Sequence, residues 1–380
     1  MYRSELPAKF ALIGHPPDLP LFRAYVRHLK PEKTFRDELI LKLFEWSPAY
    51  KVRQWEGLEI PGKGAADGIM IMVPFLPEMK DIKLRRVVEK IEGALAIAAD
   101  EGCATAALGA FTSIVLSGRE PELSKKYGLR ITSGNTMTAA LIVRSIEELV
   151  ERFELRLENL VMTIIGASGD IGSGCMLYFG SRVREMKVTA RNVDLLRGIV
   201  EKQREHAGCP VRIGGEDCNR AFAGEADVVI LVTSAYRSIL RLEDFGRGTI
   251  VCDASAPLNV EINGSRRSDV FLYHGGVARL PFALDPGFDI GLAASNTMYG
   301  CMTEGILTAV DPALPGSWGR GNITLEKLRA YLGVLDGASA GVTVEFSTGD
   351  RLYSSDELKE YESTWRRFRS EAPREGREKS

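Results

Sequence analysis

The chain has 380 residues, of which 45% are hydrophobic and 26% are charged, and its formal net charge is −2. Such a length predicts two or three domains, and such a composition is typical of a globular protein with a real core. The weak net charge argues against nucleic acid as a partner, and no apolar run approaches the roughly 18 residues that span a bilayer. The apolar patch near the N-terminus is too short for a signal-peptide core, so the sequence predicts a cytoplasmic protein without an integral membrane segment.

Cysteine usage predicts neither a metal site nor a disulfide framework. No two cysteines form a CxxC pair, and only four histidines accompany them. On composition alone each thiol is a reduced side chain with no chemical role. The six cysteines are Cys103, Cys175, Cys209, Cys218, Cys252 and Cys301.

Residues 1–135 alternate strands and helices and are expected to form an N-terminal α/β substrate domain. Apolar runs predict strands at 9–15 and 68–76, and helical spacing predicts a helix over 81–102. Residues 103–116 are expected to be a strand that runs into a loop of small residues. A long helix follows, with Ser133 or Asn135 as its cap, and residues 136–155 connect to the next domain.

Residues 156–290 have the pattern of a doubly wound Rossmann domain, with strands at 160–165, 186–192, 226–234, 248–255 and 270–276. Residues 291–350 are expected to be a helical region that carries Cys301 back to the cleft between the domains. Residues 351–380 are charged and poor in apolar residues, which predicts a mobile tail.

A glycine-rich turn joins the first strand and helix of the Rossmann pattern. It reads GASGDIGSG from residue 166, and its GxxGxxG glycines are Gly166, Gly169 and Gly172. The first permits a tight turn, the second lets the backbone approach a pyrophosphate, and the third lets helix and strand pack closely. The turn therefore predicts dinucleotide binding, with Ala167, Ser168, Asp170 and Ile171 as its other members.

The residues after the second strand of this pattern favour NADP(H). Arg191 and Asn192 stand where an NAD enzyme usually has a carboxylate, and a guanidinium attracts a 2′-phosphate. Thr233, Ser234 and Ala235 are expected beside the nicotinamide ribose. Gly276 is expected to approach the nicotinamide, and His274 is either close to that ring or a hydrogen-bonded structural residue.

A nucleophile is the other requirement, and three functions stay open. Cys301, near a helix N-terminus, can have a lowered pKa and attack a thioester. Alternatively, Cys301 is structural and the protein is an NADP-dependent dehydrogenase of an amino or hydroxy acid, or a non-enzymatic NADP-binding protein. A shikimate-type proton relay is disfavoured, because Met137 occupies the position of its Asp.

The chain resembles the long-chain acyl-acyl-carrier-protein reductases of cyanobacteria from about residue 9 to residue 340. The shared stretches occur in family order and read FALIGH, FLPEM, ALGAFTSI, TSGNTMTA, GASGDIGSG, ARN, GGV, CMTEGIL and SWGRGNITLEKL. The segment before FLPEM, the segment DIGLAASNTMYG, Met137 and the tail beyond GASAG depart from the family pattern.

The resemblance implies that a thioester acylates Cys301, that NADPH reduces the acyl-enzyme, and that a fatty aldehyde leaves. Glu304 follows the cysteine as in the family. The resemblance also implies an acyl-carrier-protein or CoA thioester as substrate and an aldehyde-consuming enzyme as a partner. The residues expected at the acyl site are Phe75, Leu76, Phe111, Thr112, Ser113 and Asn135. Backbone amides, helped by Ser113 or Asn135, are expected to stabilise the oxyanion.

Overall fold

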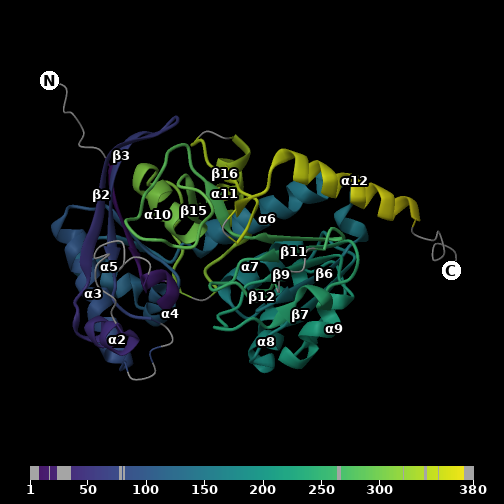
Figure 1. Cartoon of the computed structure of the whole chain (residues 1–380), viewed down its shortest axis with the longest axis horizontal. Helices are drawn as coiled ribbons and strands as arrows, with labels where there is room; N and C mark the ends of the chain where they lie inside the picture. The colour runs from purple at the N-terminus through teal and green to yellow at the C-terminus, as the bar shows by residue number, and fades with distance from the viewer. Residues whose placement is uncertain are drawn as a thin grey trace.

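A computed structural model of the chain describes residues 8–16, 18–23, 36–76, 79, 82–262, 267–319, 321–337, 340–349 and 351–371. These residues form a two-domain α/β fold in which each domain is built on its own sheet (Figure 1). The α/β class predicted from the sequence is therefore confirmed. Within the described part of the chain, no helix combines the length and apolar character that crossing a membrane requires.

The first sheet has five strands in the order β2-β3-β1-β4-β5. β2 pairs antiparallel with β3 at one edge, and the other neighbours run parallel. The predicted strands at 9–15 and 68–76 are confirmed as β1 and β3, but the largely exposed side chains of β2 give no clear apolar pattern. The strands are β1 (Ala8–Gly14), β2 (Tyr50–Ile60), β3 (Gly64–Met72), β4 (Thr105–Leu108) and β5 (Arg130–Thr132).

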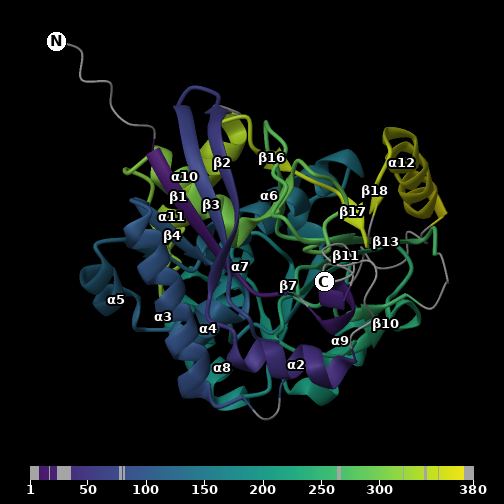
Figure 2. The ribbon, with the colours of Figure 1, turned by 60° about the vertical axis from the view of Figure 1, so that its left-hand side comes forward.

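Successive side chains of β1 pack against different helical layers, as the alternation along a strand requires. Phe10 and Leu12 belong to the apolar cluster that includes α10 (Gly300–Val310), whereas Ala11 and Ile13 pack with α3 (Leu84–Asp100). The predicted helix over 81–102 is confirmed as α3 (Figure 2). The other helices of this domain are α2 (Asp37–Trp46), α4 (Phe111–Leu116) and α5 (Glu120–Tyr127).

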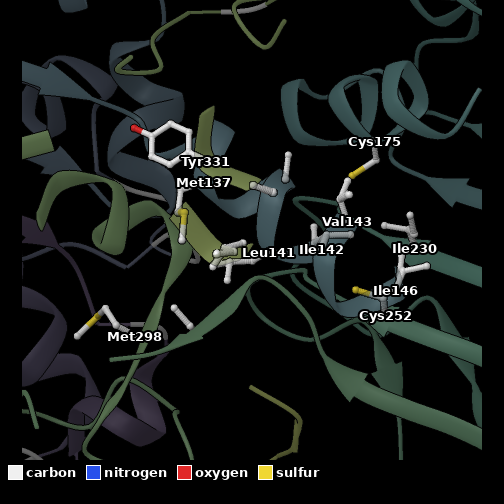
Figure 3. Close-up of a cluster of buried hydrophobic side chains, with 14 of the residues drawn as sticks. Met137, Leu141, Ile142, Val143, Ile146, Cys175, Ile230, Cys252, Met298 and Tyr331 are labelled. Atoms are coloured by element: carbon white, nitrogen blue, oxygen red, sulfur yellow. The ribbon is translucent and has the colours of Figure 1, made fainter. Parts of the chain in front are cut away.

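The long helix α6 (Asn135–Arg152) joins the two domains. Its side chains are buried on several faces, and Figure 3 shows them packed with Ile230 and Cys252 of the second sheet and with Tyr331. The helix was expected to be capped by Ser133 or Asn135, which is wrong. The N-cap is Gly134 in the left-handed conformation, and the first N–H groups of the helix donate instead to side chains distant in the sequence, Thr136 to Ser317 Oγ and Met137 to Glu304.

The second sheet has six parallel strands in the order β13-β11-β9-β6-β7-β8. β6 is the first strand of this sheet in the sequence. The next two strands, β7 and β8, are added on one side of it, and β9, β11 and β13 are added on the other, which confirms the predicted doubly wound pattern. The elements are β6 (Val161–Ile165), α7 (Asp170–Phe179), β7 (Glu185–Thr189), α8 (Val193–Gln203), β8 (Val211–Gly214), α9 (Asn219–Gly224), β9 (Val228–Leu231), β11 (Thr249–Asp253) and β13 (Val270–His274). Short elements complete the domain: η1 (Leu157–Asn159), η2 (Arg204–His206), η3 (Glu216–Cys218), β10 (Leu240–Arg241), η4 (Leu242–Asp244) and β12 (Val260–Glu261).

After the second sheet the chain returns to the first domain. α10 contacts β1, β4 and α6, which confirms the expected return of the helix that carries Cys301. A small antiparallel sheet has the strand order β15-β14-β16, in which β14 and β15 precede α10 in the sequence and β16 follows it. The elements are β14 (Val277–Arg279), β15 (Thr297–Tyr299), α11 (Leu325–Gly337), β16 (Thr343–Val344), β17 (Ser347–Thr348) and β18 (Arg351–Leu352).

The last described segment differs from the predicted mobile tail over 351–380. Residues 355–371 form α12 (Ser355–Glu371), which packs on the second domain. Trp365 is 2% exposed and stacks on Phe153 with 4.8 Å between ring centroids, and Tyr361 lies edge-on to Phe271 at 4.9 Å. The helical spacing of Leu358, Tyr361, Trp365 and Phe368 is the signal that the charged composition conceals. Residues 372–380 lie outside the described part of the chain.

Candidate active site

A cavity of about 1190 Å³ lies between the two domains. Its wall includes the carboxyl ends of strands from both sheets and the first residues of α6, α7 and α10. Three helix N-termini, each the positive end of a helix dipole, therefore face one space. The space is somewhat larger than a typical pocket for one drug-sized ligand, which measures roughly 300–1,000 Å³.

The glycine loop forms the floor of the second-domain side of the cavity. Gly166 has φ +91°, and a Cβ there would lie 2.5 Å from the Val232 carbonyl oxygen. A Cβ on Gly172 would lie 2.6 Å from the Gly166 carbonyl oxygen, which explains the glycine where α7 meets the strand turn. Ser168, Gly169, Asp170 and Ile171 line the cavity together with Gly166, whereas Ala167 and Gly172 lie behind this surface.

Asp170 links three segments at the start of α7. It accepts hydrogen bonds from Asn135 Nδ2 at 3.1 Å and from the Gly321 backbone N–H at 3.0 Å. Burial raises the pKa of its carboxyl, and these donors act in the opposite direction. Asn135, expected at the acyl site, lines the cavity but directs its amide to Asp170.

Arg191 and Asn192, which follow β7 next to the glycine loop, also line the cavity. Arg191 donates from Nη2 to the Ser234 hydroxyl at 3.0 Å, and Asn192 caps α8 by accepting from the Leu195 N–H at 2.9 Å. Glu216 lines the same part of the cavity and was not anticipated, because the four-residue strand β8 that precedes it is too short to give a clear pattern in the sequence.

A buried network fixes the loops that follow β9 and β11. Asp253 accepts from the backbone N–H groups of Ser255, Asn259 and Val260, and burial raises its pKa to about 6. Asn259 also donates to the Ala235 carbonyl at 3.0 Å and accepts from the Thr233 hydroxyl. The predicted residues Thr233, Ser234 and Ala235 line the cavity, as does Gly276. Sequence reasoning missed Asp253 and Asn259, although the polar residues directly after a buried strand are a usable signal.

Cys301 is the second residue of α10 and is partly exposed to the cavity. All six cysteines are described, and Cys301 alone among them lines this space. Two glycines bring α10 against α6: a Cβ on Gly134 would lie 2.1 Å from the Cys301 Cα, and one on Gly300 would lie 2.7 Å from the Thr138 Cα. The backbone around the thiol is therefore closely held.

The electrostatics of Cys301 differ from the expected lowering of its pKa. Burial raises the pKa of the thiol to about 11, although the backbone N–H groups of Ala110 and Met302 hydrogen-bond to the sulfur and favour the thiolate. The helix N-terminus thus does not outweigh the desolvation of the sulfur.

Ala110 has an unusual backbone conformation, φ +50° and ψ −124°, at the turn from β4 into α4. A non-glycine residue in this region is strained, and such strain is characteristic of functional sites. The next N–H, of Phe111, donates to His15 Nε2 at 3.3 Å, and His15 Nδ1 lies 2.8 Å from the Pro16 carbonyl oxygen. Burial lowers the pKa of His15 to about 4, so the ring is neutral and donates from Nδ1. Neither Ala110 nor His15 was anticipated as a site residue.

The residues expected to hold an acyl chain divide into two groups. Phe111 and Ser113 line the cavity. Phe75 and Leu76 are buried in the core, and the Thr112 hydroxyl donates to the Gly109 carbonyl at 2.7 Å. The apolar wall on the first-domain side and around Cys301 consists instead of Leu12, Leu21, Met70, Phe288, Ile290, Leu292, Met298 and Met302.

Glu304 lies one turn beyond Cys301 and is fully buried. Its carboxylate accepts from the Met137 N–H at 2.9 Å, the Ser317 N–H at 2.7 Å, the Ser317 hydroxyl and the Thr132 hydroxyl. Burial raises its pKa, and these donors oppose the shift. Glu304 therefore joins α10 to β5, to the start of α6 and to the 317 loop.

No protein-family model matches the chain. The long-chain acyl-[acyl-carrier-protein] reductase of Synechococcus elongatus is 26% identical over 339 residues, which cover 84% of this chain and 95% of the relative.

Solved structures resemble the chain only in part. Shikimate 5-dehydrogenase of Listeria monocytogenes has a TM-score of 0.32 at 12% identity and covers 67% of this chain and 81% of its own. The nucleotide-binding domain of glutamyl-tRNA reductase of Thermoplasma volcanium has a TM-score of 0.27 at 21% identity and covers 35% and 84%. Because both TM-scores are low, the fold assignment rests on the strand orders described above.

Proposed function

We propose that the protein reduces a long-chain acyl thioester to a fatty aldehyde, with NADPH as reductant and Cys301 as nucleophile. The observation that carries this proposal is the single cavity shared by the thiol of Cys301, the glycine loop and an apolar wall. The cyanobacterial acyl-carrier-protein reductase, similar over most of both chains, supports the reaction class and a carrier-linked thioester as the acyl donor.

The residues present fit a dinucleotide. Backbone at Gly166 and Gly172 leaves no room for a Cβ, and the N-terminus of α7 opens onto the cavity, as a pyrophosphate requires. Arg191 would hold the 2′-phosphate of NADPH, with Ser234 as its neighbour. The nicotinamide half of the dinucleotide would be bordered by Thr233, Ala235 and Gly276. These residues follow strands on the side of β6 away from β7 and Arg191.

Cys301 would attack the carbonyl carbon of the thioester, and the bond from that carbon to the donor sulfur would break. The departing thiolate takes up the proton that Cys301 loses, so acylation is balanced without a net proton. The N–H groups of Ala110 and Met302, which point at the sulfur, are the donors that stabilise negative charge there. When bound, NADPH supplies the hydride that releases the aldehyde from the acylated Cys301.

The remaining chain residues position and enclose this chemistry. Glu304 fixes α10, and His15 fixes the turn that orients the Ala110 N–H. Leu12, Met70 and Met302 would contact the acyl chain and exclude water from the thioester. Met137 is fully buried and outside the cavity wall, which further disfavours a proton relay at its position.

The experiment that tests the proposal compares Cys301→Ala with Cys209→Ala, a partly exposed cysteine outside the cavity. Aldehyde formation and NADPH consumption are measured with a palmitoyl thioester of carrier protein and of CoA. We expect Cys301→Ala to lose aldehyde formation and keep NADPH binding, while Cys209→Ala retains both. Unchanged turnover in Cys301→Ala would refute the role of the thiol and favour a dehydrogenase in which Cys301 is structural.

A further inference from the structure

His274 is the last residue of β13 and lines the cavity, yet it is only 5% exposed. Its Nδ1 is buried and has no hydrogen-bond partner among the described residues. Buried polar atoms without partners are uncommon in native proteins, and each one calls for a physical explanation. The alternative left open by the sequence, a hydrogen-bonded structural histidine, does not match this arrangement.

The unpartnered nitrogen decides where the ring carries its proton. Burial lowers the pKa of His274 to about 4, so at neutral pH the ring is uncharged and has one N–H. An orphaned N–H is less tolerable in a protein interior than an orphaned acceptor. The proton therefore belongs on Nε2, which is not among the buried atoms without a partner. His274 thus presents a neutral N–H donor to the cavity.

Topology indicates which ligand group meets this donor. The glycine loop follows β6, Arg191 follows β7, and His274 ends β13 at the opposite edge of the sheet. A dinucleotide laid across the carboxyl ends of these strands with its 2′-phosphate at Arg191 has its nicotinamide over β9, β11 and β13. The other acceptor in the reaction, the thioester oxygen, would be close to Cys301, where the Ala110 and Met302 N–H groups already point.

The backbone connects this donor to the catalytic helix. The Gly276 carbonyl accepts from the Gly300 N–H at 2.8 Å, and the rings of His274 and Tyr299 are 5.6 Å apart between centroids. These contacts fix the position of a group bound by His274 relative to the first residues of α10. We propose that His274 Nε2–H binds the carboxamide oxygen of the nicotinamide and so orients that ring beside Cys301, an inference that rests on the proposed function.

Calorimetric titration of the whole protein with NADP⁺ and with 2′,5′-ADP, which lacks the nicotinamide half, tests the inference. The variants are His274→Phe, which keeps a ring without a donor, His274→Gln, which keeps an N–H donor, and the exposed His206→Ala as control. We expect His274→Phe to weaken NADP⁺ about three- to tenfold, the value of one net hydrogen bond, and to leave 2′,5′-ADP unchanged. His274→Gln should recover part of the loss, and His206→Ala should bind as the unaltered protein does.

Thionicotinamide-NADP⁺, whose sulfur is a poor acceptor, supplies a second readout. It should bind the unaltered protein more weakly than NADP⁺ does, and the difference should disappear in His274→Phe. Equal NADP⁺ affinity in His274→Phe and the unaltered protein would overturn the inference. The His274 N–H would then donate to a water or to the acyl group rather than to the nicotinamide. Loss of 2′,5′-ADP binding would also overturn it, since the effect would then be structural. Failure of the proposed function, seen as turnover in Cys301→Ala, leaves these binding results interpretable.

Discussion

Gly134→Ala perturbs the contact that places Cys301. Gly134 has φ +67°, and an added Cβ would lie 2.1 Å from the Cα and 2.2 Å from the carbonyl oxygen of Cys301. The left-handed backbone costs an alanine ~1–2 kcal/mol. Because the clashing atoms are backbone, α10 must also move, and overpacking of this kind costs ~1–3 kcal/mol. The expected loss in the free energy of unfolding is therefore ~2–5 kcal/mol.

Gly128→Ala is the matched control for this prediction. Gly128 has φ +66° at the end of α5, and no atom lies within 4 Å of an added Cβ, so only the backbone cost of ~1–2 kcal/mol applies. Urea unfolding measures both variants, and intact-mass detection of the acyl adduct reports the position of the thiol. We expect slower acylation in Gly134→Ala and an unchanged rate in Gly128→Ala. Equal unfolding free energies and equal acylation rates would refute the view that this close contact positions Cys301.

Three further predictions address the cofactor, the thiol and the C-terminal helix. Arg191→Asp should weaken NADPH binding by about tenfold or more, because a charge-assisted phosphate contact is replaced by repulsion, and unchanged preference over NADH in titrations would exclude that contact. Alkylation of Cys301 by iodoacetamide without substrate should accelerate from pH 7 to pH 10, because burial raises the pKa of the thiol to about 11 and the reactive thiolate forms only as the pH rises. A midpoint of the rate-against-pH curve below the usual thiol pKa of 9.0 would contradict the burial of the sulfur. Trp365→Ala should lower the free energy of unfolding by ~3–5 kcal/mol in urea titrations, and a change under ~1 kcal/mol would mean that α12 is not part of the core.

Local patterns made much of the fold predictable. Apolar runs and helical spacing predicted β1, β3, α3 and α6, and the regular alternation after residue 160 predicted the second sheet. The glycine turn was predictable because its demands are local: the clashes at Gly166 and Gly172 involve atoms of the same strand-turn-helix unit or of the neighbouring strand end. The edge strand β2, whose side chains are largely exposed, and the four-residue strand β8 have no such signal.

The site depends on contacts between distant residues, which no local pattern encodes. Phe111 and His15 are 96 positions apart, and Gly134 meets Cys301 across 167 positions of the printed sequence. For the same reason the residues expected at the acyl site include Phe75, Leu76 and Thr112, which are buried and do not line the cavity. The positive φ of Ala110 has no signal in the sequence, because the residue is not a glycine. The raised pKa of Cys301 likewise reflects the burial of the thiol, which outweighs the effect of the helix N-terminus that the sequence emphasises.

The most direct test of the account is the intact mass of the protein after incubation with palmitoyl carrier protein or palmitoyl-CoA in the absence of NADPH. The account predicts an increase of one acyl group, which peptide mapping assigns to Cys301 and which disappears when NADPH is added and aldehyde is released. Cys301→Ala should show no increase, and Cys209→Ala should show the full one. Aldehyde formation without any adduct on Cys301, or an adduct that NADPH does not discharge, would contradict the proposed role of this thiol.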